Sequence, residues 1–147
     1  KGDDHEWPAK ISDRTKNNGS GCPICSGRKV VISNCLATRY PELSKEWHPT
    51  KNKLTPYEVS SGSNKEVWWK CPKGNDHEWL TRIVKRVNGS GCLVCNNNKV
   101  VSSNCLVTTH PELSKEWHPT KNKLTPYEVH FGANKKAWWK CSKGDDQ

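Results

Sequence analysis

Four residues in the middle of the chain have the types and the spacing of a metal site. Five residues separate Cys71 from His77, fourteen separate His77 from Cys92, and two separate Cys92 from Cys95. Three thiols and one imidazole make up a ligand set that closes a tetrahedral structural zinc site. Gly91 lets the backbone bend before the last two cysteines, which can then place two sulfurs on one ion. We therefore expect Zn2+ as the cofactor, bound by Cys71, His77, Cys92 and Cys95.

Two alternatives compete with this ligand set. The cysteines would form disulfides in a secreted domain, but no secretion signal is visible in the sequence, which favours metal binding. The other alternative keeps the metal and replaces His77 by Cys105, because the exchange preserves the ligand chemistry. Against it, His5 repeats the His-Glu-Trp context of His77, and Cys35 and Cys105 both stand between Asn and Leu. Cysteine often behaves as a small buried hydrophobe in such a setting, and the replacement remains open at this point.

Partial copies of the ligand set lie near both ends of the sequence. His5, Cys22 and Cys25 repeat its second part, and the counterpart of Cys71 would precede residue 1. Cys141 repeats its first part, and the sequence ends one step short of the next histidine. We expect these four residues to be metal ligands too, in a chain cut from a longer array. Cys141 would complete a site with a following module, or a second copy of the chain would supply its partners head to tail.

The sequence contains an internal duplication. The 19 residues 41–59 recur without change as residues 111–129, and the offset of 70 places each cysteine of the first copy onto one of the second. The segment before Cys22 is two residues longer than the segment before Cys92, so that His5 lies 72 residues before His77. We predict one module in residues 1–70, a second in residues 71–140, and the start of a further module in residues 141–147.

The elements that must position these residues are short. Residues 66–71 and 77–87 are rich in β-branched and aromatic side chains and predict two strands, and residues 92–95 predict a tight turn. Pro41 at a first helical position predicts a short helix through Trp47, and Thr55-Pro56 predicts another helical turn.

The composition limits the size of the core. Only 32% of the residues are hydrophobic and the mean hydropathy is −0.94, so that a domain of this size depends on another source of stability such as a metal. Eight Trp against one Phe and no Met make Trp the expected packing material. We therefore predict a small, metal-stabilised α+β fold of tandem modules, with short β-hairpins and short helices. No apolar run is long enough to cross a bilayer, so we expect an intracellular protein with no membrane partner.

Several motifs, in order and twice, resemble the probable zinc-ribbon family of tandem treble-clef-like domains. They are Trp68-Trp69-Lys70-Cys71, His77-Glu78-Trp79, Gly91-Cys92-x2-Cys95 and Glu116-Trp117-His118-Pro119-Thr120-Lys121-Asn122. The resemblance covers nearly the whole chain and implies zinc-binding modules of about this length, often repeated and sometimes joined to nuclease-like domains. Cys35 and Cys105 stand where this family pattern leads us to expect Ser.

The charge balance favours a polyanionic partner. The chain has 24 Lys and Arg against 15 Asp and Glu, a net charge of +9. Basic residues near Trp and Tyr could contact phosphates while the rings stack on bases. The candidates are Lys51, Lys53, Lys121, Lys123, Arg82, Lys85 and Arg86. The alternative is a basic surface that is simply solvated, and the sequence does not distinguish DNA from RNA.

Three functions follow, and we expect the first. It is a non-catalytic zinc module that binds nucleic acid mainly through backbone phosphates. The second is a structural or protein-interaction spacer in a large assembly, whose partners are acidic proteins. The third is a metal-dependent nuclease in which His48 or His118 acts as the base. Residues 119–122 offer no obvious second ligand set for an open catalytic ion, which is why we expect no enzyme activity.

Overall fold

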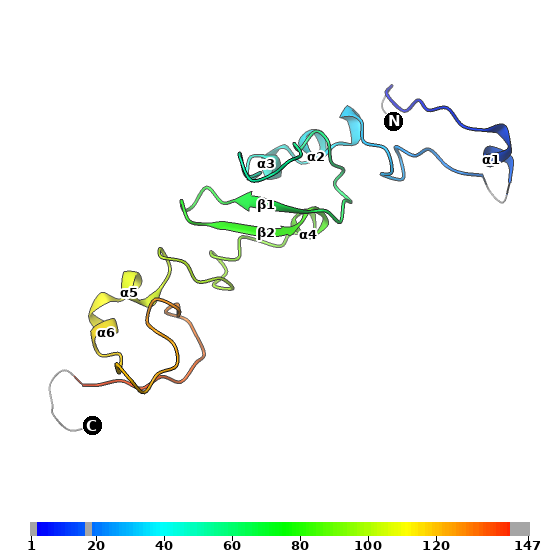
Figure 1. The fold of residues 1–147 in the computed structure, drawn as a ribbon. Coiled ribbons are helices and arrows are strands. Elements are labelled where there is room, and N and C mark those ends of the chain that lie inside the picture. Colours follow the sequence, from blue (N-terminus) through cyan, green and yellow to red (C-terminus); the bar gives the residue numbers. More distant parts are fainter. Residues whose placement is uncertain (1–2, 17–18, 142–147) are drawn as a thin grey trace. The chain divides into compact units, whose positions relative to one another are not determined.

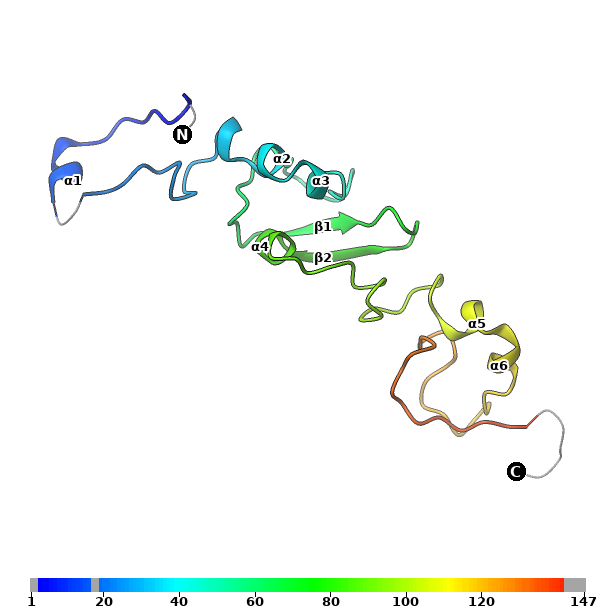
Figure 2. The same ribbon diagram turned by 180° about the vertical axis from the view of Figure 1, so that it is seen from behind.

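The structure is a computed structural model that describes residues 3–16 and 19–141. It forms two compact units, which are described separately (Figures 1 and 2). The first unit comprises Lys1–Lys70 and Trp79–Ser90, and the second comprises Cys71–Glu78 and Gly91–Gln147. The segment 79–90 thus packs with the sequence that precedes the Cys71 loop. The three modules inferred from the repeat stay a prediction about sequence organisation.

Seven short elements are described in and around the first unit. They are α1 (Ile11–Thr15), the 3-10 helix η1 (Ile32–Asn34), α2 (Leu36–Arg39), α3 (Pro41–Ser44), β1 (Glu66–Lys70), β2 (Glu78–Arg82) and α4 (Ile83–Val87). The strands β1 and β2 pair in a two-stranded sheet, and α4 follows β2 directly (Figure 1). The second unit contains α5 (Leu106–Thr109) and α6 (Pro111–Lys115). These elements confirm the predicted small α+β fold with a short hairpin and short helices.

The strand predicted over residues 77–87 is wrong in its second half. The strand β2 ends at Arg82, and Ile83 begins the helix α4. Ile83 and Arg86 are one helical turn apart and are both buried, so that one helical face packs inward where a strand would alternate. The helix predicted from Pro41 through Trp47 is too long, because α3 ends at Ser44 and Trp47 pairs with Trp69 in an antiparallel bridge. The predicted helical turn at Thr55 is a turn without helix, and the short helices α2 and α5 were not predicted.

Tryptophan forms the centre of the first unit. Trp69 is fully buried and Trp79 is 2% exposed, and the Trp47 ring meets the Trp69 ring edge to face with 5.5 Å between centroids. The indole N–H of Trp69 donates to the carbonyl oxygen of Thr81 at 3.2 Å, and that of Trp47 donates to Leu54 at 3.0 Å. Burial therefore leaves both of these indole donors bonded, as the expected use of Trp for packing requires.

The second unit repeats this framework with less burial. Trp117 and Trp139 meet edge to face with 5.1 Å between centroids, and a single antiparallel bridge joins the same two residues. Trp139 is nevertheless 43% exposed. None of the helices in the described part of the chain has the length and apolar character needed to cross a lipid bilayer.

Candidate metal centre

The hairpin between β1 and β2 and the turn at residues 92–95 bring four ligand groups together. Cys71 follows β1 and His77 precedes β2, and the N–H of Cys71 donates to the carbonyl oxygen of His77 at 3.0 Å. Cys92 and Cys95 lie on one turn. The N–H of Asn96 donates a hydrogen bond to the carbonyl oxygen of Cys92 at 3.1 Å and closes this turn. The three sulfurs and the imidazole nitrogen all lie within 4.8 Å of one another.

The distances between these atoms fit a tetrahedral zinc ion. Two thiolates at about 2.3 Å from such an ion lie about 3.8 Å apart. Sγ of Cys71 and Sγ of Cys95 are 3.8 Å apart. Nδ1 of His77 is 3.8 Å from Sγ of Cys92 and 3.4 Å from Sγ of Cys95. The donor set, with three soft thiols and one imidazole, also has the chemistry that Zn2+ prefers.

A hydrogen-bonded chain orients the His77 ring. Nε2 of His77 lies 3.2 Å from the hydroxyl of Ser103, which donates to Asp76 at 2.8 Å, and the Ser103 N–H donates to the same carboxylate at 2.9 Å. Because the hydroxyl hydrogen is used on Asp76, Nε2 is the donor toward Ser103 and Nδ1 faces the thiols with its lone pair. Such outer hydrogen bonds fix the tautomer and the ring orientation of a metal-binding histidine.

The electrostatics of the cluster call for a cation. Burial, followed by hydrogen bonds and charge repulsion with Cys92 and Cys71, raises the pKa of the Cys95 thiol to about 11. Burial also raises the pKa of Asp76, but the Ser103 hydrogen bonds and the nearby His77 outweigh it and hold that pKa below its ordinary value. Neighbouring thiolates repel one another, and a bound divalent cation compensates for that repulsion.

Gly74 lets the loop pass close to the histidine ring. A Cβ at this position would lie 2.5 Å from Cδ2 of His77 and 2.7 Å from its Nε2. No side chain fits into that space unless the ring moves away from the thiols. Gly74 therefore shapes the loop that presents Cys71 and His77 together.

The first unit contains a three-ligand version of the same arrangement. Nδ1 of His5 lies 3.9 Å from Sγ of Cys22 and 3.4 Å from Sγ of Cys25, and these three residues form a metal-compatible group. Nε2 of His5 lies 3.2 Å from the hydroxyl of Ser33, which is bonded to Asp4. The outer hydrogen bonds of the two clusters are therefore the same, and the number of ligands differs.

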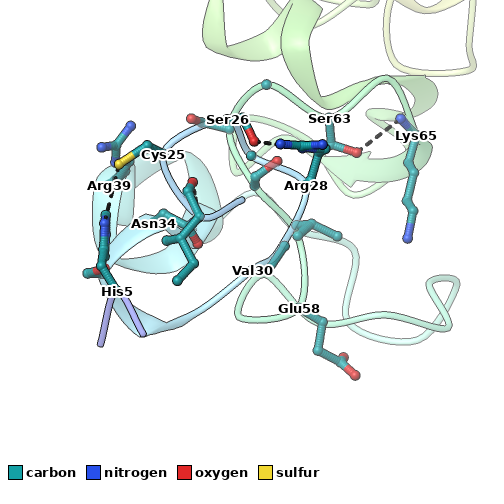
Figure 3. A pocket seen from close by; sticks show the side chains of 17 residues that line it. His5, Cys25, Ser26, Arg28, Val30, Asn34, Arg39, Glu58, Ser63 and Lys65 are labelled. Carbon is teal, nitrogen blue, oxygen red and sulfur yellow. Dashed lines mark hydrogen bonds between the residues drawn. The ribbon is translucent and has the colours of Figure 1, made fainter. Parts of the chain in front are cut away.

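A polar pocket of about 770 Å³ opens beside this three-ligand cluster. Figure 3 shows His5 and Cys25 at one side of it and Arg28, Ser63 and Lys65 at the other. The basic side chains that line it add to the positive charge of the first unit.

The remaining cysteines occupy two kinds of environment. Cys35 is fully buried and Cys105 is 1% exposed, and their thiols donate to the carbonyl oxygens of Ile32 and Ser102. The four-ligand group assembled by the structure contains His77 and not Cys105. Cys141 is exposed, and the residues that follow it lie outside the described part of the chain.

The outer hydrogen bonds were missed in the sequence, although a signal for them was present. Asp precedes both histidines, and Ser33 and Ser103 stand 70 residues apart in matching Ser-Asn-Cys motifs. The next residue of this motif also has a role, because the Asn104 side chain accepts from the N–H of Val101 and donates to Val94 and Lys99. These bonds tie the Cys92–Cys95 turn to the segment that carries Ser103.

The candidate phosphate-binding residues do not share one environment. Five of them are exposed lysines, namely Lys51, Lys53, Lys85, Lys121 and Lys123. The Arg82 side chain is 53% exposed, and its Nε lies 3.9 Å from Oε1 of Glu66. Arg86 is only 9% exposed, donates to Glu46 at 2.6 Å, and lies over the rings of Trp69 and Trp79. Arg86 therefore packs inside the first unit and is not part of a phosphate-binding surface.

The comparison with family models decides the relationship. The model described as "Probable Treble clef zinc finger domain" matches residues 1–28, 43–98 and 113–147. The chain belongs to this family. Zinc is therefore the cofactor of this treble clef zinc finger protein, as the Cys/His clusters also indicate. The matched ranges contain each of the eight candidate metal ligands and neither Cys35 nor Cys105. A search of curated proteins finds no match.

Proposed function

We propose that this zinc finger protein binds nucleic acid through the phosphate backbone, and that zinc held by Cys71, His77, Cys92 and Cys95 maintains the fold that presents the binding surface. The observation that carries the proposal is a groove of lysines beside a tryptophan, which occurs once in each unit at equivalent positions. We call the two grooves the Trp68 groove and the Trp138 groove.

The Trp138 groove is a hollow of about 220 Å³ in the second unit. Trp138 is 60% exposed, and Nζ of Lys121 lies 5.1 Å from its ring centroid. Four lysines line the groove, namely Lys121, Lys123, Lys135 and Lys136. Lysine ammonium groups bind phosphates, and an exposed indole face stacks on a base, which together suit a single strand or an unpaired end.

The Trp68 groove in the first unit has the same plan and less charge. Its lining includes Lys51, Lys53, Lys65 and Trp68, and Nζ of Lys51 lies 4.6 Å from the Trp68 ring centroid. Glu66 stands where the other groove has Lys136. We therefore expect the Trp138 groove to bind a polyanion more strongly than the Trp68 groove.

The Glu-Trp-His-Pro-Thr-Lys-Asn motif, repeated at residues 46–52 and 116–122, gives each groove its shape. Nδ1 of His118, a residue only 9% exposed, accepts hydrogen bonds from the N–H groups of Thr120 and Lys121, each at 3.2 Å. The Asn122 amide then exchanges two bonds with the backbone of Trp138, at 2.7 and 2.9 Å. The lysine loop is thereby fixed to the segment that carries the ring. His118 has a structural role in this arrangement, which supports a binding protein over a nuclease.

Filter binding to single-stranded and duplex DNA and RNA over a series of salt concentrations tests the proposal. Affinity should fall steeply with salt, and Lys121→Ala with Lys123→Ala should lower the slope of log affinity against log salt by about one for each lysine. Lys115→Ala is the matched control, because Lys115 is an exposed lysine whose partner is Glu112 on the same helix. An affinity for acidic proteins with none for nucleic acid would overturn the proposal and support the protein-interaction alternative.

A further inference from the structure

One pattern of Trp, Ile and Arg occurs twice in the sequence, and its two copies have different surroundings. In the first unit the copy at residues 79–90 lies on a surface formed by Glu46, Trp47 and Trp69. Arg86 reaches Glu46 at 2.6 Å, its guanidinium lies 5.4 Å from the Trp69 ring centroid, and Ile83 is fully buried. We call residues 79–90 and the described part of their counterpart, residues 7–16, the docking segments, and the surface under residues 79–90 the Trp69 platform.

The docking segment at residues 7–16 has the same helix start and the same Arg–Trp contact as its counterpart. The helix α1 begins at Ile11 as α4 begins at Ile83, and Arg14 lies 5.4 Å over the Trp7 ring as Arg86 lies over Trp79. Arg14 also donates to the carbonyl oxygen of Ser20, as Arg86 does to that of Ser90.

The exposure of this segment is nevertheless opposite to that of its counterpart. Ile11 is 83% exposed, whereas Ile83 is fully buried. Burying an exposed isoleucine side chain is favourable, so this segment presents an apolar surface that a partner would stabilise by covering it.

The second unit offers the matching surface. Its Trp139 corresponds to Trp69 and is 43% exposed where Trp69 is fully buried. The support under it is already formed, because Trp117 contacts Trp139 at 5.1 Å and the N–H of Lys140 donates to the carbonyl oxygen of Glu116 at 2.6 Å. We call Glu116 and Trp139 the Trp139 platform.

We infer that the docking segment at residues 7–16 of one copy of this chain binds the Trp139 platform of a second copy, head to tail. Ile11 and Trp7 cover Trp139, and Arg14 faces Glu116 as Arg86 faces Glu46. Cys141 of the second copy, two residues beyond Trp139, joins His5, Cys22 and Cys25 of the first as the fourth ligand of a shared zinc site. The three-ligand cluster thereby reaches the four ligands that structural zinc takes.

The internal example supports this occupant over an unrelated protein. The Trp69 platform already holds a docking segment in which Trp, Ile and Arg recur at matching positions. An interface between two different surfaces of the same chain is heterologous, so that the assembly grows head to tail into a ring or an open filament.

The docking surface and the nucleic-acid groove use opposite sides of one short segment. Neighbouring residues in extended backbone point to opposite faces, and Trp138 lines its groove while Trp139 lies in the platform. Trp138→Ala should therefore weaken nucleic-acid binding and leave self-association intact, and Trp139→Ala should do the reverse. The two proposals can fail separately.

Sedimentation velocity of the zinc-loaded chain over a wide range of concentration tests the inference. The wild-type chain should assemble with increasing concentration, and Ile11→Asp or Trp139→Ala alone should be monomeric. An equimolar mixture of these two variants should give a one-to-one dimer and nothing larger, because each variant keeps one intact surface. Ile32→Asp is the matched control, since Ile32 is a 66% exposed isoleucine outside the docking segment.

Cys141→Ser gives a second test at the tail that leaves the platform unchanged. This variant should assemble more weakly than the wild-type chain when zinc is present. The dimer of Ile11→Asp and Trp139→Ala, in which Cys141 is intact, should bind one zinc ion more than the two monomeric variants bind in total. A wild-type chain that stays monomeric with zinc would overturn the inference. A mixture that stays monomeric, or assembly that survives Ile11→Asp, would also overturn it.

Discussion

The two Cys/His clusters are built alike around the histidine and differ in what completes them. Each has an Asp–Ser pair behind the imidazole and two cysteines on one turn. The cluster of the second unit also has Cys71 from the end of β1, whereas the described cluster of the first unit has three ligands. The histidine shell and the turn are therefore the same in both clusters, and the fourth ligand comes from the strand that precedes the hairpin.

The largest expected difference between the clusters is in zinc-dependent folding. Cys92→Ser should unfold much of the second unit, because structural zinc sites contribute about 10 kcal/mol or more of apparent binding free energy to folding. The equivalent change in the three-ligand cluster, Cys22→Ser, should have a clearly smaller effect on the monomer. Circular dichroism during titration with a zinc chelator measures both. Equal losses from the two variants would contradict the distinction between the clusters.

The next largest difference should be in how much the tryptophan of each platform contributes to the free energy of unfolding. Trp69→Ala removes a fully buried ring and should cost about 3 to 5 kcal/mol in the free energy of unfolding. Trp139→Ala should cost less, because its ring is 43% exposed in the single chain. Urea unfolding at a concentration where the chain is monomeric provides the comparison. If Trp139→Ala destabilised the monomer as much as Trp69→Ala, its platform would be a filled core and not a docking surface.

Ser33 and Ser103, which contact His5 and His77, allow the zinc affinities of the two clusters to be compared. Ser103→Ala removes the acceptor that holds the His77 ring and should lower zinc affinity about tenfold. Ser33→Ala should act in the same direction on the first cluster. Competition with a chromophoric chelator measures the change, and Ser102→Ala is the control on the same loop, since Ser102 is exposed and its carbonyl oxygen, which Cys105 uses, is kept. An unchanged affinity in Ser103→Ala would show that the ring needs no such support.

The smallest effect concerns a turn that is the same in both copies. The N–H and hydroxyl of Thr55 donate to Glu58, and those of Thr125 donate to Glu128, which holds the pKa of each carboxyl below its ordinary value. A carboxyl with a depressed pKa contributes stability above its unfolded pKa, and this contribution is lost as the pH falls through the folded pKa. Thr55→Ala and Thr125→Ala should thus each lower stability slightly near neutral pH and approach wild type in acid. NMR titration of the two carboxyls checks this, and a wild-type pKa at the ordinary value would contradict it.

How much of the molecule could be predicted depended on how local each interaction is. The spacing of Cys71, His77, Cys92 and Cys95 specified the cluster, because a hairpin and a tight turn bring these residues together with little help from distant sequence. The helix α4 was missed, because its β-branched residues favour a strand and only the packing of Ile83 and Arg86 on the Trp69 platform favours a helix.

Burial was harder still to predict. Arg86 was expected to face phosphates, and its partner Glu46 lies 40 residues away in the sequence. Trp69 and Trp139 stand in the same Trp-Trp-Lys-Cys motif, so that nothing in their local sequence distinguishes the buried ring from the exposed one.

X-ray absorption at the zinc edge tests the central claim most directly, on the chain loaded with a single equivalent of zinc. The account predicts three sulfur ligands at about 2.3 Å and one nitrogen ligand at about 2.0 Å, with the nitrogen lost in His77→Cys. Four sulfur ligands in the wild-type chain would contradict the assignment of His77, and a shell of oxygen ligands would contradict the zinc centre itself.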